Sequence, residues 1–103
     1  MSFRKAADDG DVKQGSALRV ELDGKAIALV RNPEGKLFAL DDICSHEDAS
    51  LSEGFVENTS IECPRHGATF DLESGKAMAL PAIEAIGTYE VKVENGEILV
   101  NIT

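Results

Sequence analysis

The chain has 103 residues, 43% of them hydrophobic, and this length suits one small domain. Its formal net charge is −9, from 19 acidic and 10 basic residues. That charge argues against nucleic acid or an anionic membrane as a partner, because both attract surfaces rich in Lys and Arg. It is compatible with docking on a basic protein surface, or with solubility alone.

Short alternating segments separated by turn residues predict an all-β chain. Leu18, Val20 and Leu22 alternate with polar residues, and this period of two indicates a half-buried strand. Asp-Gly at 23–24 and Asn-Gly at 95–96 are typical of tight hairpin turns. The predicted strands span residues 2–6, 17–22, 25–31, 36–41, 60–62, 68–72, 88–94 and 97–102. The first four suggest an antiparallel meander, and the pattern contains no amphipathic helix of three turns.

A second apolar face is predicted near the C-terminus. Tyr89, Val91 and Val93 alternate within residues 88–94, so they are expected on one side of a single strand. Tyr89 is the only Tyr of the chain. Its position on this face predicts a core role rather than a chemical one.

All the Cys and His residues of the chain fall within residues 44–66. Cys44 and His46 are separated by one residue, sixteen residues lie between His46 and Cys63, and two separate Cys63 from His66. Chance rarely places two Cys and two His in two such short clusters. We therefore predict a four-ligand metal site formed by Cys44, His46, Cys63 and His66.

Two thiolates and two imidazoles suit either zinc or a [2Fe–2S] cluster with mixed ligands. A zinc finger of the Cys₂His₂ class places both Cys before both His, whereas each short cluster here supplies one Cys and one His. Two facing loops could then present the Cys pair to one iron and the His pair to the other. This C-x-H and C-x-x-H pattern resembles the Rieske family. A zinc-stabilised structural module is the less favoured alternative.

The resemblance covers nearly the whole chain and implies a single all-β Rieske domain over residues 1–103. In that fold an antiparallel β-sandwich or barrel forms the base, and a small cluster-binding β subdomain is inserted into it. The base is expected from about 1–41 and 79–103, and the cluster-binding subdomain from about 42–78. The family also implies one [2Fe–2S] cluster, with His46 and His66 at the exit for the electron.

The Cys count distinguishes kinds of Rieske protein. Relatives in respiratory and photosynthetic membrane complexes add a disulfide-forming Cys pair and a membrane anchor, whereas this chain has two Cys and no apolar run of about 18 residues. It resembles the soluble, low-potential Rieske ferredoxins, and its reduced thiols suit the cytoplasm. Gly67 and Ala68 offer no hydroxyl to the cluster, so one hydrogen bond that raises the potential in other relatives is expected to be absent.

The resemblance implies an electron carrier rather than an enzyme. A Rieske cluster held by four protein ligands has no open coordination position for a substrate. Rieske oxygenases add a mononuclear iron held by two His and a carboxylate, and this chain has no further His. We expect a ferredoxin that takes electrons from an NAD(P)H-dependent flavin reductase and passes them to an aromatic-ring-hydroxylating oxygenase. The alternative is a small Rieske-like subunit of another redox enzyme, such as assimilatory nitrite reductase.

Several residues near the motif have a functional and a plain interpretation. By resemblance, Pro81 belongs to a loop that covers the cluster from water, although a plain turn is the alternative. The charged residues nearest the motif either dock a partner or only form a solvated rim. They are Glu47, Asp48, Glu53 and Arg65.

Overall fold

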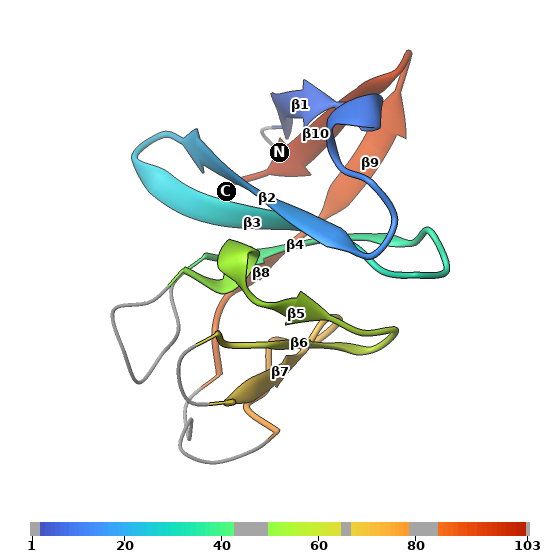
Figure 1. Cartoon of the computed structure of the whole chain (residues 1–103). Coiled ribbons are helices and arrows are strands. Elements are labelled where there is room, and N and C mark those ends of the chain that lie inside the picture. The colour runs from blue at the N-terminus through green and yellow to red at the C-terminus, as the bar shows by residue number, and fades with distance from the viewer. Residues whose placement is uncertain (1–2, 43–49, 65–66, 79–84, 103) are drawn as a thin grey trace.

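In the part of the chain that the structure describes, the fold consists of three antiparallel sheets (Figure 1). This computed structural model describes residues 3–42, 50–64, 67–78 and 85–102. The strands are β1 (Phe3–Asp8), β2 (Ser16–Leu22), β3 (Lys25–Arg31), β4 (Leu37–Asp41), β5 (Phe55–Val56), β6 (Ser60–Glu62), β7 (Thr69–Asp71), β8 (Thr88–Tyr89), β9 (Val91–Glu94) and β10 (Glu97–Asn101), with single 3₁₀ turns η1 (Asp9–Asp11) and η2 (Leu51–Glu53). The sheet orders are β1-β10-β9, β2-β3-β4-β8 and β5-β6-β7. The predicted all-β class, with a sandwich-like base and a small further sheet, is confirmed.

Strand β3 lies between two hydrophobic cores, so both of its faces are buried. Ile27 and Leu29 pack in a core shared with the β1-β10-β9 sheet, whereas Ala28 and Val30 pack in a core shared with the β5-β6-β7 sheet. All four side chains are 0% exposed. Double burial explains why this strand is apolar throughout instead of alternating.

Both predicted hairpin turns are present. Asp23 and Gly24 have φ of 50° and 80°, and Asn95 and Gly96 have φ of 52° and 76°. Two consecutive residues with positive φ match the twist of the flanking strands, and Asn, Asp and Gly tolerate that conformation best. The β2–β3 register, which pairs Leu22 with Lys25, follows from this turn.

The predicted strand over residues 88–94 is wrong as a single element. Strand β8 pairs with β4 in the middle sheet, whereas β9 pairs with β10 in the outer sheet. Glu90 lies at the change of sheet, and its carbonyl accepts a hydrogen bond from the backbone N–H of Asn101 at 2.9 Å. The predicted common apolar face is confirmed for Tyr89 and Val91, which both pack against the base core, and is wrong for Val93, which is 45% exposed on the edge strand β9.

Two other strands depart from the sequence pattern. Strand β1 does not join the meander of β2, β3 and β4, and instead pairs with β10, with Phe3 opposite Asn101. Strand β5 was not predicted, since two residues are too short to show an alternation. Within the described parts of the chain no helix is long and apolar enough to cross a membrane.

Candidate metal centre

Cys63 is the one predicted ligand within the described residues; Cys44, His46 and His66 lie outside them. Cys63 directly follows β6, and its side chain is free of any disulfide and 1% exposed. It packs in the core between the small sheet and the middle sheet. The thiol is therefore anchored in an apolar layer rather than carried on a surface loop.

The strand pairing explains why Cys63 points inward. Ile61 is 0% exposed while Glu62 is partly exposed, so the alternation returns the next side chain to the inner face. The backbone N–H of Cys63 donates to the carbonyl of Ala68 at 2.6 Å and closes the turn between β6 and β7. Gly67 within that turn has a φ of 72°, a conformation that other residues rarely adopt.

Asp42 fixes the segment that follows residues 43–49. This carboxylate is 0% exposed. It accepts hydrogen bonds from the Ser50 hydroxyl and, at 2.7 Å, from the backbone N–H of Ser52. Its own carbonyl accepts from the N–H of Leu51 at 2.8 Å, and Arg19 Nε lies 3.8 Å from the carboxylate. The two chain ends that flank residues 43–49 are thus tied to one buried group.

Asp41, the last residue of β4, makes a similar connection to residues 87–89. Its carboxylate accepts from the backbone N–H of Gly87 at 2.9 Å and from the Tyr89 hydroxyl, and its own N–H donates to the Gly87 carbonyl at 2.9 Å. A Cβ on Gly87 would lie 2.7 Å from this carboxylate, so a larger residue there would displace the Asp41 side chain. Burial, followed by the hydrogen bond to Asp41 and its charge, raises the pKa of Tyr89 to about 12.

Sequence reasoning missed both carboxylates. An Asp-Asp pair at a strand end next to a ligand motif is a weak signal, because exposed acidic pairs are common. The later Ser50 and Ser52 supply the partners of Asp42, but their pairing depends on a loop closure that no local pattern predicts. Tyr89 does pack against the base core as expected, with the addition of its hydroxyl bond to Asp41.

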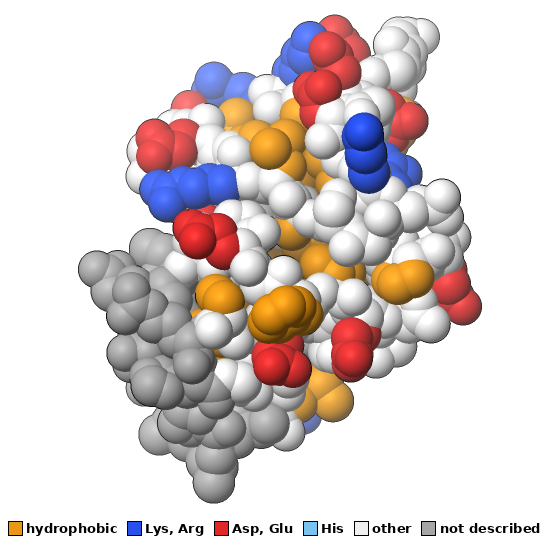
Figure 2. Space-filling view, in the orientation of Figure 1, with side chains coloured by type: hydrophobic (Ala, Val, Ile, Leu, Met, Phe, Trp, Pro, Cys, Tyr) orange, Lys and Arg blue, Asp and Glu red, His pale blue; other side chains and the backbone are white. Residues whose placement is uncertain are grey.

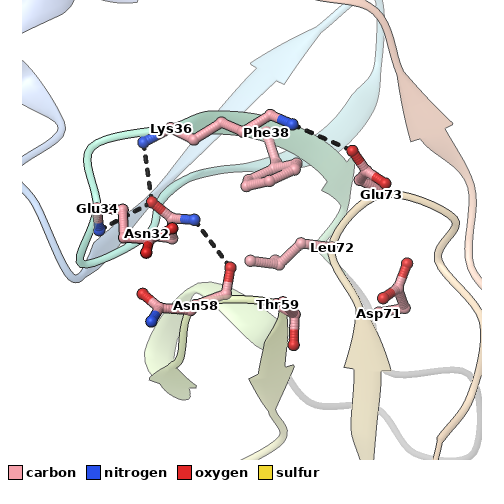
Figure 3. Close-up of a pocket in the computed structure, with 9 residues that line it drawn as sticks. All are labelled: Asn32, Glu34, Lys36, Phe38, Asn58, Thr59, Asp71, Leu72 and Glu73. Atoms are coloured by element: carbon pink, nitrogen blue, oxygen red, sulfur yellow. Dashed lines mark hydrogen bonds and ion pairs between the residues drawn. The ribbon is translucent and has the colours of Figure 1, made fainter.

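A pocket of about 230 Å³ is lined by residues of the middle and small sheets (Figure 3). Its lining residues Asn58 and Thr59 precede β6, whereas Cys63 follows that strand. At this pocket the Asn32 amide, 3% exposed, donates to the Asn58 carbonyl at 2.8 Å, and Lys36 Nζ lies 3.1 Å from the Glu73 carboxylate. These contacts join the middle sheet to the small sheet. The pocket therefore belongs to the connection between the two sheets and not to the metal centre.

The residues present fit a cluster with thiolate ligands. Cys63 supplies a free, buried sulfur directly after β6, where a soft thiolate ligand is shielded from water. Ala68 is 0% exposed and carries no hydroxyl, as the sequence indicated. Glu53 is exposed in η2. The other proposed contributors lie outside the described residues; they are Glu47, Asp48, Arg65 and Pro81.

Comparison with known proteins identifies the family. Residues 2–90 match the Rieske [2Fe-2S] domain family. The 3-phenylpropionate/cinnamic acid dioxygenase ferredoxin subunit of Escherichia coli (strain K12) is 43% identical over 93 residues, which is 89% of this chain and 86% of that protein. The naphthalene 1,2-dioxygenase system ferredoxin component of Pseudomonas putida is 39% identical over 93 residues, which is 90% of this chain and 88% of that protein.

Solved structures agree with this assignment. A complex of reduced oxygenase and oxidised ferredoxin in carbazole 1,9a-dioxygenase has a chain that is 33% identical, with a TM-score of 0.86 over 95% of this chain and 91% of that one. A structure described as a nitrite reductase small subunit from Mycobacterium tuberculosis is 24% identical, with a TM-score of 0.85 over 96% of this chain and 93% of that one, and shows a shared fold only. With a family match over most of its length and a relative at 43% identity, this chain belongs to the Rieske [2Fe-2S] domain family, whose cofactor is a Rieske-type [2Fe–2S] cluster.

Proposed function

We propose that this chain is a one-electron carrier that delivers electrons to the terminal oxygenase of a ring-hydroxylating dioxygenase system. The observation that carries the proposal is the ligand count: two Cys and two His, all within one Rieske motif. No further His remains to bind a mononuclear iron, so the chain has no oxygen-activating site with two His ligands. Its relatives in the phenylpropionate and naphthalene systems are ferredoxin components.

The proposed ligands are Cys44 and Cys63 for one iron, and His46 and His66 for the other. When bound, the cluster supplies one-electron chemistry at a potential that its surroundings set. Cys63 contributes a sulfur held by the β6–β7 turn. The residues around it exclude water from that side, since Ile61, Ala68 and Cys63 itself are all buried.

The domain organisation follows the same scheme. We assign residues 1–103 to one domain, with the base from about 1–41 and 79–103 and the cluster-binding subdomain from about 42–78. The β5-β6-β7 sheet, which carries Cys63, falls within that subdomain. Pro81 is assigned to the loop that covers the cluster.

The proposed partners are a flavin-dependent, NAD(P)H-fed reductase as electron donor and the oxygenase as acceptor. The carbazole ferredoxin in complex with its oxygenase supports the second contact. We also propose that the protein is cytoplasmic. Both Cys residues are assigned as cluster ligands, so no Cys pair remains for a disulfide, and this suits a compartment where thiols stay reduced. The nitrite reductase alternative rests on fold similarity alone.

Metal analysis and electron transfer test the proposal together. Anaerobically purified protein should contain two irons and two acid-labile sulfides per chain, and Cys63→Ser should lose both, because the thiolate is the stronger ligand. The reduced protein should then be reoxidised by the oxygenase of the phenylpropionate or the naphthalene system. Stoichiometric zinc without labile sulfide would contradict the cofactor, and reduced protein that no oxygenase reoxidises would contradict the carrier role.

A further inference from the structure

The outer face of the β5-β6-β7 sheet presents an ordered row of side chains beside the metal centre. Phe55 pairs with Glu62, and Glu62 with Thr69. The backbone N–H of Met78 donates to the Thr69 carbonyl at 2.8 Å, which extends the row by one residue. Directly paired residues share a face of the sheet, so these four side chains point the same way.

This row is the outward one. The neighbouring row, Val56, Ile61, Phe70 and Ala77, packs in the core against the middle sheet. By the alternation of strands, the Phe55 row must therefore face away from the core. Phe55 is 63% exposed and Met78 is 58% exposed.

The exposure of these two side chains is unusual for this protein. Among the described residues three large hydrophobic side chains are exposed, and Val93 on β9 is the third, at 45%. Phe55 and Met78 lie at the two ends of one row, and Glu62, which lies within that row, directly precedes Cys63 in the chain. Two exposed apolar side chains on one face of a sheet, next to a functional centre, indicate a protein contact rather than chance.

The charge on the same face is acidic. The next outward row, towards the β5–β6 turn, contains Glu57, Ser60, Asp71 and Lys76. The Glu57 N–H donates to the Ser60 carbonyl, and Ser60 pairs with Asp71. The Asp71 N–H in turn donates to the Lys76 carbonyl. With Glu62, the two rows carry three acidic groups and one basic group. Figure 2 shows hydrophobic side chains over this part of the molecule with acidic ones next to them, while most visible Lys and Arg lie over the base.

We propose that the outer face of the β5-β6-β7 sheet is a docking surface for the terminal oxygenase, and that the oxygenase meets it with an apolar patch bordered by Lys and Arg. The proposal rests on the proposed function. Phe55 and Met78 supply the apolar contact, while Glu57 and Glu62 select a basic border by charge complementarity. A partner docked here would contact Glu62, which directly precedes the proposed ligand Cys63 in the chain.

Single substitutions with matched controls test this surface. Phe55→Ser and Met78→Ser should each lower the second-order rate constant for reoxidation of the reduced protein by about fivefold or more, the effect expected of an interface anchor. The oxygenase used is that of the phenylpropionate or the naphthalene system, whichever the unaltered chain serves faster. Val93→Ser removes the third exposed apolar side chain, which lies on β9 of the base and is 45% exposed, and should change the rate less than about twofold.

The charge is tested in parallel. Glu57→Gln should weaken the salt dependence of the rate constant, whereas Glu94→Gln, a matched change on β9, should leave it unchanged. The visible and EPR spectra and the midpoint potential should stay the same in all five variants, because none of the altered residues is a ligand.

The outcomes separate the docking surface from the proposed function. If the unaltered chain transfers no electron to either oxygenase, the carrier role fails and the proposal falls with it. If the unaltered chain transfers electrons while Phe55→Ser and Met78→Ser do so equally fast, only the docking surface is refuted. If these variants slow reduction by a reductase but not delivery to the oxygenase, the oxygenase assignment is overturned in favour of the reductase.

Discussion

Removing the Asp42 carboxylate should loosen the metal centre before it unfolds the base. Asp42→Ala deletes two hydrogen-bond acceptors, for the Ser50 hydroxyl and for the Ser52 N–H at 2.7 Å. Hydrogen bonds to a charged group contribute about 1.5–3 kcal/mol each. Relief of the desolvation of a 0% exposed carboxylate offsets part of this loss, and Arg19, 50% exposed, compensates its charge only weakly.

We therefore expect a net destabilisation of about 2–4 kcal/mol, which is large against a typical domain stability of roughly 5–15 kcal/mol. For a domain of this size it corresponds to a fall in Tm of about 10 °C or more. Asp42→Asn keeps one acceptor for the Ser52 N–H and should lose roughly half as much.

The assay is thermal melting by far-ultraviolet circular dichroism, with the cluster absorbance followed in the same sample. Cluster bleaching should precede loss of β-structure in Asp42→Ala, since the hydrogen bonds lost are those that hold the chain beside the ligand motif. Asp23→Asn is the control, because Asp23 is half-exposed in a turn where Asn adopts the same positive φ. A Tm for Asp42→Ala within about 2 °C of the unaltered protein, with coincident transitions, would refute the role assigned to Asp42.

Three further predictions concern other parts of the fold. Tyr89 is the only Tyr in a chain without Trp, and it should ionise with a midpoint near 12 in an ultraviolet difference titration. The folded state favours the neutral phenol. The stability that this preference contributes to the fold is complete below about pH 10 and is lost as the pH rises towards 12. A midpoint near 10 would contradict the buried contact with Asp41. Gly54→Ala places a Cβ 2.0 Å from the Glu62 carbonyl and should cost about 2 kcal/mol or more in denaturant unfolding, whereas Gly10→Ala meets nothing within 4 Å and should change stability by less than about 0.5 kcal/mol. The midpoint potential should lie in the lower part of the Rieske range of about −150 to +300 mV, and protein-film voltammetry giving more than roughly +100 mV would show that the missing hydroxyl donor has little influence.

Local patterns predicted most of the strands because each strand carries its own signal. The alternation of Leu18, Val20 and Leu22 and the Asp-Gly and Asn-Gly turns act over a few residues, and the structure places strands and turns there. Sheet membership is different, because it depends on partners far along the chain. Nothing in the alternation of Tyr89 and Val91 reveals that the strand changes sheets between them.

The site shows the same division. The spacing of Cys and His identified the ligand set as a hypothesis and led to the family, since metal ligands must be particular residue types. The structure adds the burial of Cys63 and the roles of Asp41 and Asp42. Those roles require knowledge of loop closure, which brings Ser50 and Gly87 to the end of β4. A short strand such as β5 likewise exists through its pairing with β6 rather than through its own sequence.

The pairing of β1 with β10 has a consequence for the order in which the molecule forms. Phe3 lies opposite Asn101, so nearly the entire chain must be ordered or looped out before this contact can close. Closing such a long loop is entropically costly, and non-local pairings of this kind slow folding. The β5-β6-β7 sheet forms within residues 55–71, so its formation does not depend on closing that long loop. In refolding kinetics, hydrogen-exchange protection should therefore appear at Ile61 and Phe70 before Val100, and the ligand-bearing turn should exist while both ends of the chain are still free.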